Sequence, residues 1–397
     1  MNQIIEQYQR EFARFFGVRW AFAFWKGRVG LYALLRALDI AEGDEVILPG
    51  YTCVMNVNPI KYLGAQPIYV DIEHDTFNIN VNLLKEKITD NTKVIIAQHT
   101  YGYPCDMDTI MEISASRGIP IIEDCCLALG SRYKNKIAGT FGKAAYFSFQ
   151  WNKPYTTGLG GMVITNDREI AKRIESLQTD EMCPPSSPEV FMLRLQLMVY
   201  RLLIYPKTTA LAQNMFRYLT KKGAVVGSSS TSEFEPVKAE DFFKGISTVQ
   251  ARSGLRQLQK IEQNMAHRIQ MAQLYDRLLE EKGWRARAYD ETIMQPVMVR
   301  YPLRIAEKTE ALEQAAKAGI ELGSWFECPL HPIETPLVSY DYEPGMCPEA
   351  EKAAGQIVNL PLHPRANEKI AERTVQFITG FTQVSPNLSF ASASSHP

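Results

Sequence analysis

Lys153 is the residue whose setting in the sequence points most directly to covalent chemistry. It follows an apolar run, residues 144–149, that predicts a buried strand, and it precedes a glycine-rich bend and a second apolar strand over residues 162–165. A lysine on a turn between two buried strands is partly shielded from water and loses its proton more readily than a free lysine. The neutral amine can form a Schiff base. A lysine alone is more often a solvated surface residue, so its neighbours decide between these interpretations.

Asp124 is the second residue with a distinctive setting. It comes at the end of a predicted strand, residues 119–122, and is expected to be largely buried. A buried carboxylate needs a cation or hydrogen-bond donors as partners. Two interpretations remain open: the carboxylate caps the start of a helix, which aspartate does well, or it pairs with the protonated nitrogen of a pyridine ring.

Gly27 and Arg28 lie where a predicted strand, residues 21–25, passes into a predicted helix, residues 31–38. Backbone amides at a helix start can hold a phosphate, and a guanidinium there suits an anion. A plain turn is an equal alternative, because no GxGxxG or Walker spacing is present. Pyridoxal phosphate needs a lysine, an acid and an anion cradle from its protein. Lys153, Asp124 and the Gly27-Arg28 turn with Ser148 supply one of each.

The elements that position these residues alternate between strand and helix through the first half of the chain. This order predicts an α/β fold, in which a mostly parallel sheet is covered by helices on both faces. Ligands of such sheets bind beyond the carboxyl ends of the strands. Tyr51, His99, Asp124 and Lys153 all come at or just after a predicted strand end.

Composition excludes several classes of protein. The 43 basic residues nearly balance the 44 acidic residues, so no strong field attracts nucleic acid or an anionic membrane. The seven cysteines form no CxxC motif, which favours reduced thiols and a cytoplasmic location. The N-terminal residues predict an acidic amphipathic helix, not a signal peptide, and no uncharged apolar run approaches the ~18 residues of a transmembrane helix. We expect a small-molecule ligand and no metal site.

Several motifs together resemble the DegT and StrS type of sugar aminotransferase, a family of pyridoxal-phosphate enzymes of fold type I. The likeness spans roughly residues 5–177 and 245–380, and its motifs are specific in combination. These motifs are GDEVILP at 43–49, GAQPIYVDI at 64–72, YGYPCDM at 101–107, IIED at 121–124, FSF at 147–149 with Lys153 five residues beyond Ser148, and LPLHP at 360–364.

The resemblance implies roles for residues at the matching positions. Lys153 would hold pyridoxal phosphate covalently, and Asp124 would contact its pyridine nitrogen. Ser148 with the Gly27-Arg28 turn would hold the phosphate, and Tyr51 would stack on the ring. The resemblance also implies a homodimer with shared active sites.

The resemblance further implies two domains. We expect a large cofactor-binding domain over residues 1–255, a smaller α+β domain over residues 256–384 and a disordered tail over residues 385–397. A helical insertion, about residues 178–244, interrupts the first domain. Its apolar stretch, residues 190–219, favours burial in the protein or a dimer interface, and contact with a membrane surface is the alternative.

The sequence also departs from the family pattern. Arg28 stands where relatives have threonine or serine, Leu127 where they have glutamine, and Phe243 where they have an asparagine that reaches the partner subunit. For the substrate, His331 lies in a proline-rich turn that borders the pocket in relatives, and His99 lies at a strand end. Both are expected as substrate contacts, and for His331 a structural role is the alternative.

The function that the sequence predicts is amino transfer from an amino acid, glutamate, to a keto-sugar linked to a nucleotide. Such products are used in polysaccharide, lipopolysaccharide or antibiotic synthesis. Lys153 would also move the proton in the central step. Two alternatives stay open: another pyridoxal-phosphate reaction on a sugar, such as dehydration or elimination, and a regulatory protein that keeps the fold without catalysis.

Overall fold

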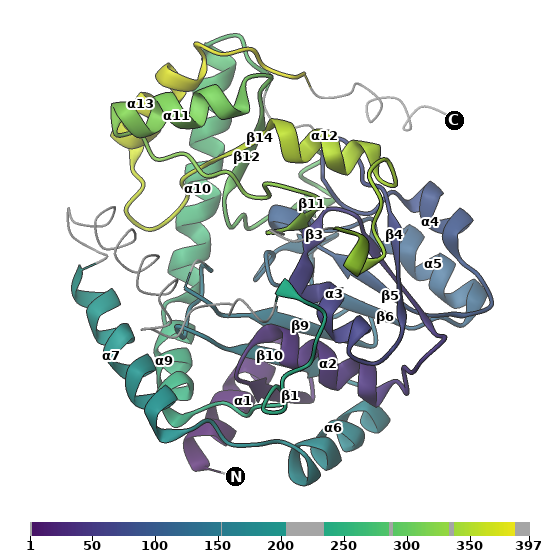
Figure 1. The fold of residues 1–397 in the computed structure, drawn as a ribbon. Helices are drawn as coiled ribbons and strands as arrows, with labels where there is room; N and C mark the ends of the chain where they lie inside the picture. Colours follow the sequence, from purple (N-terminus) through teal and green to yellow (C-terminus); the bar gives the residue numbers. More distant parts are fainter. Residues whose placement is uncertain (1, 152, 204–233, 286–288, 333–336, 386–397) are drawn as a thin grey trace.

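A computed structural model describes residues 2–151, 153–203, 234–285, 289–332 and 337–385 (Figure 1). A seven-stranded sheet forms its centre, in the order β1 (Trp20–Phe24), β10 (Gly161–Thr165), β9 (Ala144–Ser148), β6 (Ile121–Asp124), β5 (Thr92–Gln98), β2 (Glu45–Pro49) and β4 (Gln66–Val70). The five strands from β9 to β4 are parallel, and β10 is antiparallel to both of its neighbours. The predicted α/β class with a mostly parallel sheet is confirmed.

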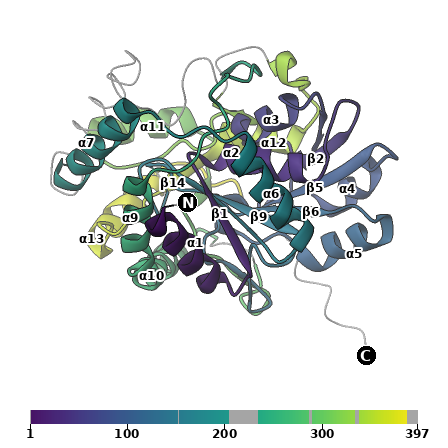
Figure 2. The ribbon, with the colours of Figure 1, turned by 90° about the horizontal axis from the view of Figure 1, so that it is seen from below.

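Helices cover both faces of this sheet (Figure 2). Neighbouring residues of a strand point to opposite faces: Val163 of β10 joins the apolar cluster of α2 (Gly27–Ala37), whereas Met162 joins the cluster of α1 (Gln3–Phe16). The other helices of the first half are α3 (Val54–Lys61), α4 (Val81–Lys87), α5 (Met107–Arg117) and α6 (Arg168–Asp180), with a short 3-10 helix at Thr100–Gly102. Because both faces of the sheet are buried, its strands consist almost entirely of apolar residues.

Helix α1 follows directly from its sequence. The side chain of Asn2 accepts a hydrogen bond from the Ile4 backbone amide and caps the N-terminus of the helix. Gly17 ends the helix in the left-handed conformation, at a φ of 67°, which glycine adopts without a steric cost. The buried aromatic residues Tyr8, Phe12 and Phe16 pack α1 against β9 and the segment after it.

The C-terminal part begins after α9 (Thr248–Leu258) with the long helix α10 (Ile261–Glu281). Strands β12 (Tyr301–Arg304) and β14 (Ile357–Leu360) pair antiparallel there, beside α11 (Lys308–Ala318), α12 (Pro348–Gln356) and α13 (Glu368–Ile378). A 3-10 helix spans Leu337–Tyr340, and β7 (Arg132–Tyr133), β8 (Lys136–Ile137) and β11 (Met294–Gln295) form a small sheet. The division into domains at residues 255 and 256 stays a prediction.

Two short strands join the C-terminal part to the carboxyl edge of the large sheet. β3 (Thr52–Cys53) follows β2, and it pairs in parallel with β13 (Leu330–His331). This pairing brings the turn before β13 over the same edge at which Asp124 and Ser148 end their strands.

The insertion contributes α7 (Ser187–Leu203) to the described structure. Leu193 and Leu197 are buried in a cluster with Trp151, whereas Phe191 and Met198 are 68% and 53% exposed. The apolar stretch that begins at residue 190 is therefore helical, as predicted, as far as Leu203. The rest of this stretch, residues 204–219, and the expected disordered tail, from residue 386 on, lie outside the described residues. In the part of the chain that the structure describes, no helix is long and apolar enough to cross a membrane.

Candidate active site

The start of α2 forms a cradle at the carboxyl end of β9. The helix begins at Gly27, earlier than the predicted residue 31, and no side chain caps its N-terminus among the described residues. A Cβ atom on Gly27 would lie 2.9 Å from Ser148 Cβ and 3.0 Å from the Phe147 carbonyl oxygen. Gly161, which pairs with Ser148, is as tightly packed, since its Cβ would lie 2.5 Å from Gly27 Cα. Only glycine lets the helix start approach Ser148 this closely, and uncapped amides at such a position suit a phosphate.

Arg28 occupies the first turn of α2 and is 7% exposed. Its Nη1 lies 2.5 Å from the sulfur of Met55 in α3. A guanidinium at a helix N-terminus opposes the helix dipole, so its burial there is unfavourable unless an anion is near. The position of Arg28 is therefore compatible with the predicted phosphate contact, which stays a prediction.

Asp124 is the last residue of β6 and is 3% exposed. Its Oδ2 accepts a hydrogen bond of 2.7 Å from Asn56 Nδ2 of α3, and its Oδ1 accepts one of 2.8 Å from the Cys126 backbone amide. No helix follows β6 directly, so the carboxylate does not act as a helix cap. These two hydrogen bonds offset part of the cost of burying the carboxylate.

Lys153 lies on the segment between β9 and β10, as predicted. Its Nζ lies 4.7 Å from the centre of the Trp325 ring, a cation–π distance. Burial lowers the pKa of Lys153, while Cys126 and Asp124 act in the opposite direction. Burial therefore favours the neutral amine, while Asp124 and Cys126 remain close enough to stabilise the protonated one.

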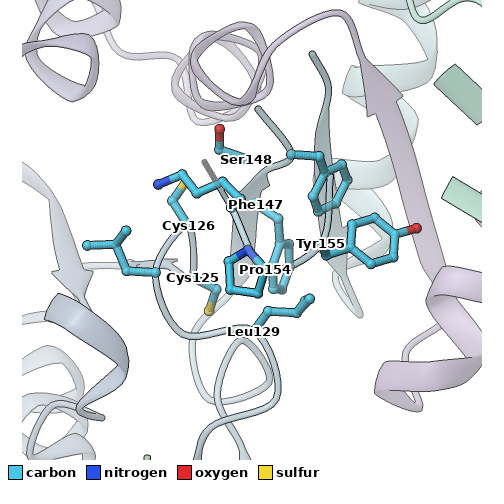
Figure 3. Close-up of a pocket in the computed structure, with 10 residues that line it drawn as sticks. Cys125, Cys126, Leu129, Phe147, Ser148, Pro154 and Tyr155 are labelled. Carbon is cyan, nitrogen blue, oxygen red and sulfur yellow. The ribbon is translucent and has the colours of Figure 1, made fainter. Parts of the chain in front are cut away.

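A small cavity lies beside Lys153. Its lining comes from the segment after β6, the end of β9 and the lysine segment, and includes Cys126, Leu127 and Ser148 (Figure 3). Burial is the main cause that raises the pKa of the Cys126 thiol, and the neighbouring Asp124 adds to it. Cys126 is thus a neutral thiol at the edge of the site. Leu127, at the family's glutamine position, presents an apolar side chain to the same cavity.

Tyr51 closes the site on the side of the C-terminal part. It is fully buried, and its hydroxyl lies 3.0 Å from that of Tyr101 and accepts a hydrogen bond of 3.3 Å from the Phe326 amide. Its ring meets the Phe326 ring edge-on at 5.1 Å. Tyr51 therefore holds the turn that carries Trp325, and its predicted stacking on a cofactor ring stays a prediction.

The two candidate histidines differ in their surroundings. His331 is partly buried in β13, with its ring 6.1 Å from Trp325, and burial lowers its pKa to about 4. Its Nδ1 accepts a hydrogen bond of 3.3 Å from the Glu327 amide. His331 is therefore a neutral ring close to Lys153, and its contact with a substrate stays a prediction.

His99 does not belong to the site. Its Nε2 lies 3.1 Å from Glu123 Oε2, its Nδ1 accepts from the Cys105 amide, and its side chain is fully buried. Gln98 and Asp124 are register partners on neighbouring strands and both contact Asn56. Because side chains alternate along a strand, His99 and Glu123 point to the opposite face. The sequence located the strand end correctly, but the expected substrate contact of His99 is wrong.

Phe243, at the position of the partner's asparagine in relatives, packs within its own chain. Its ring lies 6.1 Å from that of Phe24 and 5.9 Å from that of Tyr32. Sequence reasoning also missed two residues that shape the site, Asn56 and Trp325. The sequence offered one sign that Asn56 has a buried polar partner, since it is a polar residue within a mostly apolar helix.

Comparison with known proteins gives the site its context. The model of the DegT/DnrJ/EryC1/StrS aminotransferase family matches residues 2–187 and 242–379, on both sides of the insertion. The match includes the segments that carry Gly27, Asp124, Ser148 and Lys153. It leaves out most of the insertion.

Two curated relatives match part of the chain. The GDP-perosamine synthase of Escherichia coli O157:H7 is 47% identical over 169 residues, which are 43% of this chain and 46% of that protein. The GDP-perosamine synthase of Caulobacter vibrioides is 39% identical over 184 residues, 46% of this chain and 50% of the relative. The chain thus spans about half the length of these curated relatives.

The structure of DesV from S. venezuelae has a similar fold. It superimposes with a TM-score of 0.75 at 24% identity, over 96% of this chain and 89% of DesV. At this identity the similarity concerns the fold.

Proposed function

Because the chain belongs to the DegT/DnrJ/EryC1/StrS aminotransferase family, we propose that it is a pyridoxal-phosphate-dependent aminotransferase that moves an amino group from glutamate to a nucleotide-linked keto-sugar. The observation that supports this most strongly is the position of Lys153, whose pKa burial lowers, in one site with Asp124. The names of the matched relatives favour a GDP-linked sugar. The product would serve polysaccharide, lipopolysaccharide or antibiotic synthesis.

The residues of the site fit this cofactor. Gly27 leaves a cradle that a Cβ would fill, Ser148 lies beside it, and both would hold the phosphate with Arg28 nearby. Asp124 would keep a proton on the pyridine nitrogen. When bound, pyridoxal phosphate supplies an aldehyde that takes the amino group and a ring that spreads negative charge.

Lys153 would act first as the covalent anchor and then, once released, as the base and acid that takes a proton from the amino-bearing carbon of the donor and delivers it to the former aldehyde carbon of the cofactor. Burial lowers its pKa, which favours the neutral form that both roles need. Trp325 lies over the amine and shields it from water. His331 is neutral because burial lowers its pKa to about 4, and its Nδ1 accepts from the Glu327 amide, so its protonated Nε2 can donate a hydrogen bond to an oxygen of the sugar.

We place the reaction in the cytoplasm and in a homodimer with shared active sites. The seven cysteines are all free, which suits a reducing compartment. Phe243 stands where relatives have an asparagine that reaches the active site of the partner subunit. In this protein, a polar contact from the partner subunit to the active site would therefore come from another residue. The exposed apolar residues of α7 keep a membrane-surface contact as the alternative to an interface.

The test is transfer of a labelled amino group. The protein is loaded with pyridoxal phosphate, given ¹⁵N-glutamate and a GDP-linked keto-sugar, and the products are weighed by mass spectrometry. An aminotransferase puts ¹⁵N into the sugar and leaves 2-oxoglutarate. Loss of water from the sugar without ¹⁵N would instead identify a dehydratase, and no change in either substrate over a panel of nucleotide sugars would favour the regulatory alternative.

A further inference from the structure

The turn that carries Trp325 over Lys153 has no helix or strand of its own. Ser324, Trp325 and Phe326 lie between α11 and β13, outside any regular element. Trp325 nevertheless reaches the site, because the centre of its ring lies 4.7 Å from Lys153 Nζ. A backbone segment outside helices and strands needs partners from other parts of the fold. The position of the Trp325 ring therefore depends on the groups that hold this turn.

Buried side chains hold the peptide between Trp325 and Phe326. The Trp325 amide donates a hydrogen bond of 2.8 Å to Asn359 Oδ1, and the Trp325 carbonyl oxygen accepts one from the Tyr101 hydroxyl. The Phe326 amide donates to the same hydroxyl at 3.0 Å. Asn359 is 1% exposed and Tyr101 is fully buried. These contacts fix the central peptide of the turn, and the carbonyl oxygens on either side of it have a different partner.

Lys308 holds these two carbonyl oxygens. Its Nζ donates hydrogen bonds of 3.2 Å to the carbonyl oxygens of Ser324 and Phe326, the residues before and after Trp325. It also donates one of 2.6 Å to the carbonyl oxygen of Ala354, in the last turn of α12. An ammonium group has three donors, one for each of these oxygens. Lys308 therefore ties the turn to the C-terminal end of α12.

The burial of Lys308 is not explained by the helix to which it belongs. It is the first residue of α11 and is 7% exposed. A cation at a helix N-terminus opposes the helix dipole, and the burial of an ammonium group is costly. The carbonyl oxygens of the turn and of the C-terminal end of α12 offset this cost, since both attract a cation. The setting of Lys308 thus suits a residue that holds the turn.

We propose that Lys308 is a positioning residue for the reaction: it holds the turn in the place where the Trp325 ring covers the amine of Lys153. The inference rests on the proposed function and deepens it. A covered amine is kept from water, and this amine is the group that must anchor the cofactor and move the proton. Lys308 acts on it through Trp325.

The charge of Lys308 also reaches the site. It lowers the pKa of His331, whose ring lies 6.1 Å from that of Trp325. An experiment must therefore separate a direct effect of this charge on Lys153 from an effect of the ring position. The access of an uncharged reagent to the neutral amine makes this separation, because neither reacting group carries a charge.

The test measures how fast acetic anhydride, an uncharged reagent, acetylates Lys153 in the cofactor-free protein. Mass spectrometry follows the label over a series of pH values up to the alkaline plateau, where the amine is fully neutral. We expect Lys308→Met to raise the plateau rate by about threefold or more, because the ring no longer covers the amine. Lys317→Met, at an exposed position in the last turn of α11, is the matched control and should leave the rate unchanged.

Two further variants test whether Lys308 acts through Trp325. Trp325→Ala removes the ring and should itself raise the plateau rate. Lys308→Met should then add nothing in the Trp325→Ala background, as expected of two residues that act through one contact. Lys308→Arg keeps a cation with several donors and should lie between the wild type and Lys308→Met. All labelling is carried out well below the thermal unfolding midpoint of each variant, so that global unfolding does not expose the lysine.

Two results would overturn the positioning role. One is a plateau rate of Lys308→Met equal to that of Lys317→Met. The other is an equal rise on adding Lys308→Met to Trp325→Ala, which would mean that the substitution loosens the site as a whole. Both leave the aminotransferase proposal intact, since that proposal fails on a separate observation: a visible spectrum of the loaded wild type that glutamate does not change.

Discussion

Asn56 Nδ2 donates a hydrogen bond of 2.7 Å to Asp124 Oδ2, from one buried side chain to another. Asn56 is itself held by contacts with Thr52 Oγ1 at 3.0 Å and Gln98 Oε1 at 3.4 Å. Gln98 in turn donates to the Tyr51 carbonyl oxygen at 2.8 Å. The carboxylate is thus oriented by a chain of polar groups that leads from α3 to the edge of the sheet.

Replacement of Asn56 by leucine should weaken the binding of pyridoxal phosphate by about tenfold, because it removes a hydrogen bond to a charged group. The dissociation constant is measured by titration of the visible absorbance. Asn82→Leu, at an exposed position of α4, is the control. If Asn56→Leu binds the cofactor as tightly as this control, Asn56 does not position Asp124.

Substitution of Gly27 by alanine should destabilise the protein by about 1–3 kcal/mol, as overpacking does, and should weaken phosphate binding. The added methyl group would lie 2.9 Å from Ser148 Cβ, where the neighbouring backbone cannot yield easily. Unfolding in urea gives the free energy, and competition by inorganic phosphate gives the anion affinity.

Gly355→Ala is the matched control for this substitution. Position 355 lies within α12, and no heavy atom lies within 4 Å of an added Cβ. Alanine there should stabilise the protein by up to about 1 kcal/mol through helix propensity. Equal effects of the two substitutions would contradict the tight approach of α2 to β9.

Lys308 should make the stability of the protein depend on pH in the alkaline range. Its Nζ donates to the carbonyl oxygens of Ser324, Phe326 and Ala354, and burial lowers its pKa to about 8. Because the folded state binds this proton more weakly than the unfolded chain, stability rises between about pH 8 and about pH 10.4, the ordinary pKa of lysine. This gain in the free energy of unfolding is lost again as the pH falls toward about 8, the pKa of Lys308 in the folded protein.

The variant Lys308→Met lacks this titration and leaves three carbonyl oxygens without their donor. Its free energy of unfolding should be lower by about 1–3 kcal/mol, and the difference from the wild type should grow from about pH 7.5 to about pH 9.5. Urea unfolding at both pH values measures it. A difference that shrinks with rising pH would have the wrong sign for a buried, neutralised lysine.

Leu193 connects α7 to the lysine segment, since it is fully buried in the cluster of Trp151 and Leu159. Leu193→Ala should therefore cost about 2–5 kcal/mol of unfolding free energy. Phe191→Ala, at a position 68% exposed on the same helix, should change it by less than about 0.5 kcal/mol. Chemical denaturation of both variants tests this. Equal costs would mean that the exposed face of α7 is covered in solution by an interface.

Local sequence patterns located the strands and turns that carry the predicted anchor residues. Lys153, Asp124 and Ser148 follow or end short apolar strands, and strand ends of a parallel sheet meet at one edge. The start of α2 was placed four residues too late, because Gly27 and Gly30 lower helix propensity. The close packing of Gly27 on Ser148 outweighs that propensity.

The remaining features depend on tertiary contacts that no local pattern encodes. Asn56 meets Asp124 across 68 residues of sequence, and Trp325 reaches Lys153 through the pairing of β3 with β13. His99 was misjudged because the strand end was clear but the face of the sheet was not. Neighbouring side chains of a strand point to opposite faces of the sheet, so Gln98 faces the site whereas His99, the next residue, faces Glu123.

The most direct test of the account is to trap the cofactor on its lysine. The purified protein is incubated with pyridoxal phosphate, reduced with sodium borohydride, digested and analysed by mass spectrometry, with Lys153→Ala treated in the same way. The account predicts that the reduced cofactor is found on the peptide that contains Lys153, that prior incubation with glutamate prevents the labelling, and that Lys153→Ala shows no label there. Label on another lysine, or none on the wild type, would contradict it.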